Sequence, residues 1–254
     1  MFCAPGTGWR ARFLSRHAPR LGAAALAVSA LSGCQSIDVN SSNATLVRVF
    51  NASPDSTGFD FYTGKTLIVA SLGFTYKTTY VPLNPGTLSI TTDQANSTQV
   101  LASVSASLGS QKNYTVITSN VAANLQETIY ADQNFPAPSG QISVRVINEA
   151  TRIGAVDIYL VPSGGKLSTT LPFATDVTVS GNSGYIDIPA GTYAVAILPT
   201  GASPGSGTTL FNGSLSSYST GGVSTVVVFD TPLTTSPAAN VEVLTDFQSP
   251  TTTG

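Results

Sequence analysis

The sequence predicts an all-β protein with two tandem β-sandwich domains of the Ig-like or transthyretin-like kind, preceded by a cleaved export signal. Most apolar residues stand in short segments rich in Val, Ile, Tyr, Phe and Thr, and Gly, Pro, Asn and Ser bound these segments, which is typical of strands and turns. No segment after residue 33 sustains a helical period of apolar residues. The second half of the chain also repeats motifs of the first half, which favours two copies of one fold over a single large domain.

Residues 1–33 have the composition of a cleaved signal peptide. Four arginines precede a short apolar run: Arg10, Arg12, Arg16 and Arg20. The run itself, Leu21 to Ser32, contains about a dozen residues, whereas a membrane-spanning helix needs about 20. A positive segment followed by a short apolar core indicates export and cleavage.

The tetrapeptide Leu31-Ser-Gly-Cys34 resembles the lipobox of bacterial lipoproteins. The resemblance implies a diacylglycerol group on Cys34, cleavage before it, and acylation of its new amino group. Two or three acyl chains give stable membrane anchoring. By analogy, Gln35 favours the outer membrane, on its periplasmic face or at the cell surface. The alternative is an ordinary cleaved signal with a chance cysteine.

The motif repeat defines the two predicted domains. The first matching block is Leu46–Asn51 against Ser143–Asn148, and in both halves an Asp follows the Arg of this block after 12 residues. Further matches are Phe59–Tyr62 with Val156–Tyr159, Tyr80–Thr87 with Tyr185–Thr192, and Tyr114–Thr118 with Thr225–Phe229. We therefore expect sandwiches of about seven strands each.

The predicted boundaries follow from the same blocks. The domains are predicted at residues 44–137 and 141–248, joined by the Pro-rich segment 135–140. Residues 34–43 are expected to form a lipidated flexible tether, and residues 249–254 a disordered tail.

Three of these motifs together resemble the bacterial domain of unknown function 4397. They are Val47-Arg-Val-Phe-Asn-Ala-Ser-Pro-Asp55, Phe59-Asp-Phe-Tyr62 and Asn84-Pro-Gly-Thr87. The second half departs from the pattern at Glu149–Arg152, where the Ala-Ser-Pro-Asp loop is missing. The resemblance implies a periplasmic or cell-surface β-sandwich protein, often a lipoprotein, and it implies no activity.

Composition excludes several classes of function. Beyond residue 33 the chain has seven basic residues against 13 acidic ones, a formal charge of −6, which disfavours nucleic-acid partners. That part contains no His, Trp or Met, and its single Cys is the lipidated Cys34. Ser-His-Asp and Cys-His catalytic sites, His/Cys zinc sites and soft copper sites are therefore excluded, and no cofactor is expected.

Carboxylates remain as candidate functional groups. Asp60 and Asp157 each stand between apolar residues, and both follow an arginine at the same distance. Because this arrangement recurs, we predict structural roles for Arg48, Asp60, Arg145 and Asp157, as Arg–Asp pairs or as loop-bracing hydrogen bonds. The alternatives are a carboxylate-based hydrolase and an oxygen-only calcium site around Asp55 or Asp132.

One loop is a candidate for ligand binding. Asn51, Ser53 and Asp55 either bind a ligand or form an Asx-type or Pro-type turn that ends the first strand. The predicted function is a non-enzymatic binding, adhesion or structural module of the cell envelope. Its expected partners are the membrane, through the lipid, and an envelope protein or polysaccharide. The alternatives are an envelope hydrolase and a purely structural spacer.

Overall fold

A computed structural model describes residues 42–248 of the chain, and the regular secondary structure of this part is β-strand apart from two short 3-10 turns. The predicted all-β class is thereby confirmed. The predicted signal peptide, Cys34, residues 34–41 of the tether and the tail lie outside the described residues. Within residues 42–248, no helix is long and apolar enough to cross a membrane.

The first sandwich has eight strands in two sheets of four. The sheets have the strand orders β4-β1-β7-β8 and β3-β2-β5-β6. The strands are β1 (Thr45–Asn51), β2 (Phe59–Thr63), β3 (Thr66–Leu72), β4 (Val81–Leu83), β5 (Gly86–Gln94), β6 (Val100–Leu108), β7 (Asn113–Ser119) and β8 (Gln126–Asp132). A 3-10 turn, η1 (Ala122–Asn124), joins the last two.

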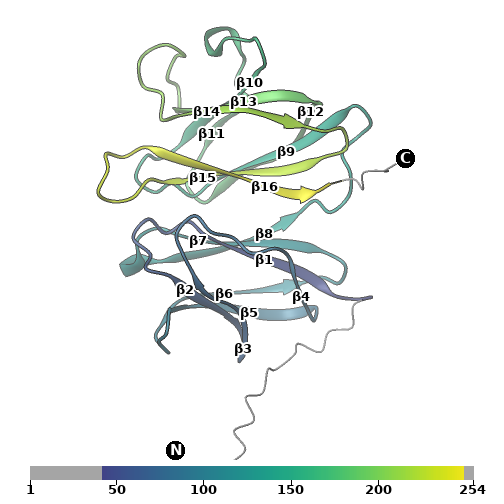
Figure 1. Cartoon of the computed structure of the whole chain (residues 1–254), viewed down its shortest axis with the longest axis vertical. Helices are drawn as coiled ribbons and strands as arrows, with labels where there is room; N and C mark the ends of the chain where they lie inside the picture. Colours follow the sequence, from purple (N-terminus) through teal and green to yellow (C-terminus); the bar gives the residue numbers. More distant parts are fainter. Residues whose placement is uncertain (1–41, 249–254) are drawn as a thin grey trace, which may run out of the picture. The chain divides into compact units, whose positions relative to one another are not determined.

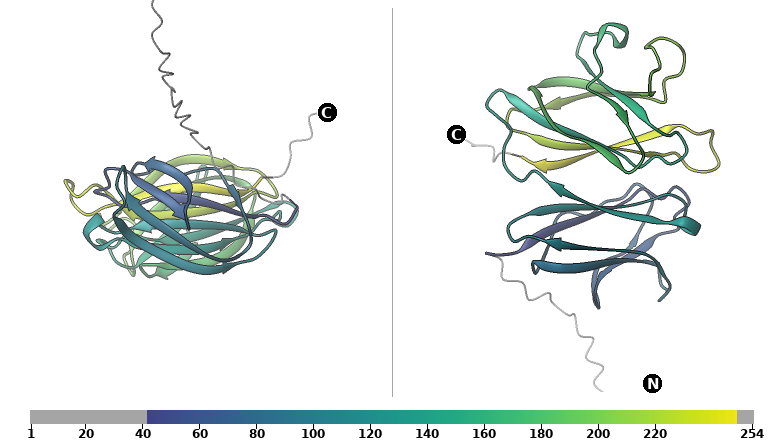
Figure 2. Two further views of the ribbon diagram at one scale, coloured as in Figure 1. Left: turned by 90° about the horizontal axis from the view of Figure 1, so that it is seen from below. Right: turned by 180° about the vertical axis from the view of Figure 1, so that it is seen from behind.

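The second sandwich repeats this order eight strands later. Its sheets are β12-β9-β15-β16 and β11-β10-β13-β14, so each half has eight strands rather than the expected seven (Figures 1 and 2). The strands are β9 (Gln141–Asn148), β10 (Val156–Pro162), β11 (Ala174–Val177), β12 (Gly181–Pro189), β13 (Gly191–Pro199), β14 (Phe211–Tyr218), β15 (Val223–Asp230) and β16 (Ala239–Phe247). The 3-10 turn η2 (Leu167–Thr169) lies between β10 and β11.

The strand order separates the two fold types named from the sequence. In an immunoglobulin domain the first two strands share a sheet. Here β1 and β2 lie in different sheets, as do β9 and β10. The first strand of each half also pairs in parallel with the seventh, β1 with β7 and β9 with β15. Two four-stranded sheets in this order correspond to the transthyretin-like arrangement.

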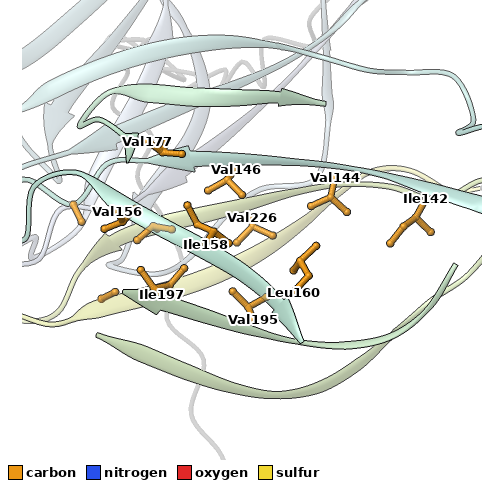
Figure 3. Close-up of a cluster of buried hydrophobic side chains, with 13 residues drawn as sticks. Ile142, Val144, Val146, Val156, Ile158, Leu160, Val177, Val195, Ile197 and Val226 are labelled. Carbon is orange, nitrogen blue, oxygen red and sulfur yellow. The ribbon is translucent and has the colours of Figure 1, made fainter. Parts of the chain in front are cut away.

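Each sandwich encloses its own apolar core between its two sheets. In the second sandwich, inward-pointing Val, Ile and Leu side chains from both sheets interdigitate (Figure 3). The buried core residues of the first sandwich are Val47, Val49, Phe59, Phe61, Leu72, Leu83, Ile90, Leu108 and Val116. The alternation of inward and outward side chains in the strands produces both cores.

A third apolar cluster joins the two sandwiches. It contains Phe50, Ala52, Ile117 and Tyr130 from the first half and Ile147, Val227, Phe229 and Leu244 from the second. The rings of Phe50 and Phe229 meet edge to face, with their centroids 5.3 Å apart. The sheets that carry β1 and β9 are thus covered on both faces, which explains why nearly every residue of these two strands is buried, polar residues included.

Candidate functional site

The two repeated arginines lie between the sandwiches. Val47 and Val49 point into the first core, so Arg48 points to the opposite face of β1. The same alternation turns Arg145 away from the core of the second sandwich. Each side chain is only 4% exposed, so the two charges need partners within the protein.

Arg48 has its closest acidic partner in the other sandwich, while Asp132 of its own sandwich lies 3.8 Å from its Nη2. Its Nε donates to Thr115 Oγ1 of its own half at 2.8 Å, and its Nη1 donates to the Thr245 carbonyl at 2.8 Å. Its Nη2 pairs with Asp246, whose side chain is fully buried.

Arg145 repeats these contacts in the opposite direction. Its Nε donates to Thr225 Oγ1 at 3.1 Å, and its Nη1 donates to the Ala131 carbonyl at 2.7 Å. Its Nη2 donates to Asp132 Oδ1 of the first sandwich at 2.5 Å. Each half therefore supplies one arginine and one aspartate to two crossed ion pairs.

Two tyrosines close the arrangement. Tyr80 donates its hydroxyl to Asp132 Oδ2, and Tyr185 donates to Asp246 Oδ2, both at 2.8 Å. Their rings cover the guanidinium groups of Arg48 and Arg145 at 4.8 and 4.7 Å. Burial raises the pKa of both tyrosines, which keeps them neutral hydrogen-bond donors.

We call this set the crossed network: Arg48, Tyr80, Thr115, Asp132, Arg145, Tyr185, Thr225 and Asp246. The threonine hydroxyls complete it, since Thr115 donates to Asp132 at 2.7 Å and Thr225 donates to Asp246 at 2.6 Å. The network holds the two sandwiches together through charge-assisted hydrogen bonds between groups of the protein itself.

The structure does not pair Arg48 with Asp60, or Arg145 with Asp157. Asp60 stands on β2 between two core phenylalanines, so it points outward from the other sheet of the sandwich, on the face opposite Arg48. Its carboxylate accepts the backbone N–H groups of Ser71 at 2.6 Å and Asn96 at 3.2 Å. Of the two structural roles predicted for the aspartates, the geometry supports loop bracing and not ion pairing.

Asp157 occupies the same place in the second sandwich. It accepts the N–H groups of Asp176 at 2.8 Å and Gly201 at 2.9 Å. Asp176 has a positive φ of 52°, as Ser71 has at 51°, so each aspartate holds a residue in left-handed backbone conformation.

The candidate ligand loop is mostly internal. Asn51 and Ser53 are fully buried, and Asn51 Oδ1 accepts the Ser53 N–H at 3.0 Å, which is an Asx turn. Asn148 forms the same turn with Ala150. Only Asp55 is exposed, and its Oδ1 accepts the Ala122 N–H at 2.8 Å.

The geometry offers little to a metal ion in the described part of the chain. No group of three or more His, Cys, Asp or Glu side chains among residues 42–248 could hold one. Asp132, one of the two residues considered for calcium, already accepts hydrogen bonds from Arg145, Thr115 and Tyr80.

An apolar hollow of about 310 Å³ opens on the second sandwich. Its lining is Leu160, Pro162, Leu171, Phe173, Ile188, Pro189 and Tyr193. Leu171 is 85% exposed. The Tyr193 hydroxyl donates to the Pro189 carbonyl at 2.8 Å, so the one side-chain polar group in the lining already has a partner.

The hollow exists because the second sandwich has a longer connection. Residues 163–173 join β10 to β11 and carry η2, Leu171 and Phe173. In the first sandwich, only Gly64 and Lys65 separate β2 from β3. The apolar surface is therefore an addition to the shared frame.

The first sandwich has a polar group at one end of its core. Strand pairing makes Thr92, Thr118 and Glu127 equivalent to the apolar residues Ile197, Val228 and Val241 of the second sandwich. Thr92 Oγ1 donates to Glu127 Oε1 at 3.0 Å, while Glu127 Oε2 is buried without a hydrogen-bond partner.

Burial raises the pKa of Glu127 to about 8; the Thr92 hydrogen bond lowers it, and the charge of Asp93 raises it further. Burial and the charge of Asp60 also raise the pKa of Asp93. Neither acid lines the apolar hollow. The molecule thus has two unshared features, an apolar hollow in one sandwich and a buried carboxyl of raised pKa in the other.

Comparison with known protein families gives a match to the first half of the chain. The Arg strand, the Asx turn and the Asp brace described above all lie within one matched range. Residues 45–159 match DUF4397, a domain of unknown function. The DUF4397 match covers β1 to β8 and continues through β9 into β10, and it does not extend over the rest of the second sandwich.

Other comparisons add no functional information. No curated protein sequence matches the chain. Two solved structures are similar at a TM-score of 0.26: the Bacillus anthracis TIE protein (9% identity, 75% of this chain) and a family CBM26 module of Eubacterium rectale Amy13K in complex with maltoheptaose (12% identity, 82% of this chain and 98% of that one). The chain spans 34% of the TIE protein. Similarity at this level supports no conclusion about ligands.

Several residues of the site were not predicted from the sequence. The predicted match of Tyr114 with Thr225 is wrong by one position, because pairing with the arginine strands aligns Thr115 with Thr225. A one-residue slip exchanges the two faces of a strand, so it concealed the repeated threonine. Asp132 and Asp246 could have been found, since Asp132 is the last residue of β8 and Asp246 is the penultimate residue of β16, the last strands of their halves.

Proposed function

We propose that the protein is a non-enzymatic binding module of the cell envelope, anchored by lipid on Cys34, which binds an apolar group of its ligand in the hollow beside Leu171. The observation that carries this proposal is the exposed apolar hollow, formed by a connection that the first sandwich lacks. Ligand sites are typically concave and largely apolar.

The chemistry of the hollow restricts its ligand. None of its seven lining residues is charged, and the Tyr193 hydroxyl is already bonded. A ligand would therefore be recognised by burial of an aliphatic or aromatic group, such as an apolar side chain of an envelope protein. A polysaccharide, the other partner considered, needs polar groups that this hollow does not offer.

A matched pair of variants tests the hollow. The chain from Gln35 onward, parent or variant, is used to capture partners from envelope extract. Leu171→Asp should abolish the capture, because it places a charge in the apolar contact. Leu67→Asp, at a leucine that is 45% exposed on β3 of the first sandwich, should leave it unchanged. Equal capture by both variants would exclude the hollow as the binding site.

The anchoring part of the proposal is tested separately. Cys34→Ser removes the thiol that the lipid would occupy. The variant should lose palmitate labelling and leave the membrane fraction, whereas the parent keeps both. Labelled, membrane-associated Cys34→Ser protein would contradict lipid anchoring without affecting the binding proposal.

One observation favours the second candidate, a carboxylate-based hydrolase. Glu127 is a buried carboxyl with a pKa of about 8, and it lies near the ionisable Asp93, a combination that general acids share. Glu127→Gln would abolish hydrolysis of any envelope substrate by such an enzyme. If the binding module is the correct interpretation, Glu127→Gln should retain the full capture that Leu171→Asp loses.

A further inference from the structure

The surface between the sandwiches is reciprocal in its contacts. Arg48 of the first half pairs with Asp246 of the second, and Arg145 of the second pairs with Asp132 of the first. Such a contact, in which residue i meets j while j meets i, is the mark of an isologous interface between two copies of a fold. The chain therefore contains in one molecule an interface of the type that joins two subunits.

The surface between the sandwiches is not suited to pairing two first sandwiches or two second sandwiches. Ser119 and Tyr130 of the first half donate hydroxyl hydrogen bonds to Glu149 of the second, both at 2.7 Å. Strand pairing makes Phe229 and Leu244 the equivalents of these donors, and Glu149 is equivalent to Ala52.

This asymmetry selects the pairing of a first sandwich with a second one. Two second sandwiches would place the buried Glu149 against Phe229 and Leu244, whose side chains have no hydrogen-bond donor. Two first sandwiches would leave the Ser119 and Tyr130 hydroxyls facing Ala52. Each unpaired buried polar group destabilises such a pairing, and a charged group does so most.

We propose that this face also accepts a second copy of the chain, in an exchanged dimer in which each first sandwich docks on the second sandwich of the other molecule. Every contact of the crossed network would form between chains as it does within one chain. An opened molecule would expose Phe50, Phe229 and the rest of the apolar cluster, so a complementary chain is the partner that restores burial. Residues 133–140 would be the hinge.

Lipid anchoring, which belongs to the proposed function, would favour exchange by concentrating chains on one surface. The exchange itself does not depend on it. Both states bury the same residues, so the balance between them is set by chain concentration and by the hinge.

Charge inversion of one face at a time tests the proposal on chains that begin at Gln35. In the first variant, Arg145→Asp and Asp246→Arg invert the second face. In the second variant, Arg48→Asp and Asp132→Arg invert the first face. Alone, each chain opposes like charges at both crossed pairs.

Mixed and refolded together, the two variants can satisfy all pairs only by exchange. The native first face of one chain meets the native second face of the other, and the two inverted faces meet each other. We expect a 1:1 heterodimer by native mass spectrometry and light scattering. The chain with all four substitutions is the control, and it should fold as a monomer because its pairs are restored within the chain.

A folded monomeric control combined with no heterodimer in the mixture would overturn the proposal. If the control itself does not fold, deletion of residues 133–139 decides the matter. The one remaining linker residue reaches about 7 Å, less than the roughly 10 Å between packed sheets, so the sandwiches of one chain cannot close on each other. A dimer is then expected, and a folded monomer would refute exchange.

Discussion

The two sandwiches share a frame and differ in what is added to it. Both have the same strand order, an Arg on the first strand, an Asx turn after it and an Asp brace on the second strand. Only the first has a buried carboxyl at its core end, Glu127, and only the second has the hollow beside Leu171. Shared residues serve folding and docking, whereas the unshared ones are where a function specific to this chain should lie.

The largest and most symmetrical effect is expected at the crossed network. Asp246→Ala removes the closer acidic partner of the buried Arg48, which keeps only Asp132 at 3.8 Å, and Asp132→Ala removes the acidic partner of Arg145. Breaking a buried ion pair by removing one partner costs about 3–5 kcal/mol. Urea unfolding of the chain from Gln35 should show losses of this size for both variants.

Replacing both partners sharpens this test. Arg48→Met combined with Asp246→Leu removes the charges together, so it should recover much of the loss caused by Asp246→Ala. If the losses in unfolding free energy of Asp132→Ala and Asp246→Ala differed by several kcal/mol, the two crossed pairs would not be equivalent. The two sandwiches would then not contribute alike to the network.

The next effect is confined to the first sandwich and depends on pH. The pKa of Glu127 is raised from 4.5 to about 8 in the folded chain, so between these values the folded chain holds a proton that the unfolded chain releases. The free energy of unfolding should therefore decrease as pH rises through this window, by at most about 1.4 kcal/mol per pH unit, and level off above it. Glu127→Gln should flatten the profile and stabilise the chain at pH 8.

Two controls accompany the pH measurement. Glu242→Gln removes a partly exposed carboxylate of the same type and should leave the slope in place. Val241→Glu introduces an acid at the equivalent site of the second sandwich, where Ile197 and Val228 offer no hydroxyl, and should destabilise the chain at neutral pH. An unchanged slope in Glu127→Gln would contradict the buried proton.

The Asp braces should again behave alike in both halves. Asp60→Ala removes the hydrogen-bond acceptor of the Ser71 and Asn96 N–H groups, and Asp157→Ala removes that of the Asp176 and Gly201 N–H groups. We expect a loss of roughly 1–3 kcal/mol for each, since partly buried donors lose a charged acceptor. Asparagine at either site retains one acceptor oxygen and should lose less. Parent-like unfolding of both alanine variants, combined with lost ligand capture, would indicate a binding role instead.

The sequence predicted the repeated frame because that frame is local. Strand alternation, turn residues and the constant Arg-to-Asp interval are properties of neighbouring residues, and they led to the correct fold class. They could not predict that Arg48 pairs with Asp246, because the two residues are 198 positions apart and the partner depends on how one sandwich docks on the other. Proximity along the chain instead suggested Asp60, which the pleat directs to the opposite side of the sandwich.

The unshared features were less predictable still. Glu127 lies near the start of β8, whose apolar residues are consecutive and do not alternate, and its burial becomes visible only when Thr92 of the opposite sheet is brought against it. The hollow depends on the path of residues 163–173, which no local pattern specifies. Apolar positions can therefore be predicted one strand at a time, whereas a buried polar residue can be interpreted only with its partner.

The smallest effect is expected at the exposed ion pair between the sandwiches, formed by Lys77 and Glu242. The second copy of the frame has Asn182 and Thr128 at the equivalent positions, so this pair has no symmetrical counterpart. Its side chains are 39% and 29% exposed, and solvent screens most of their attraction, so Lys77→Ala should cost no more than about 1 kcal/mol and less in high salt. The double variant Asn182→Lys with Thr128→Glu, which introduces the equivalent ion pair, should stabilise the chain by an equally small amount. A loss at Lys77 as large as that at Asp246, measured in the same unfolding series, would mean that the rim and not the crossed network holds the two sandwiches together.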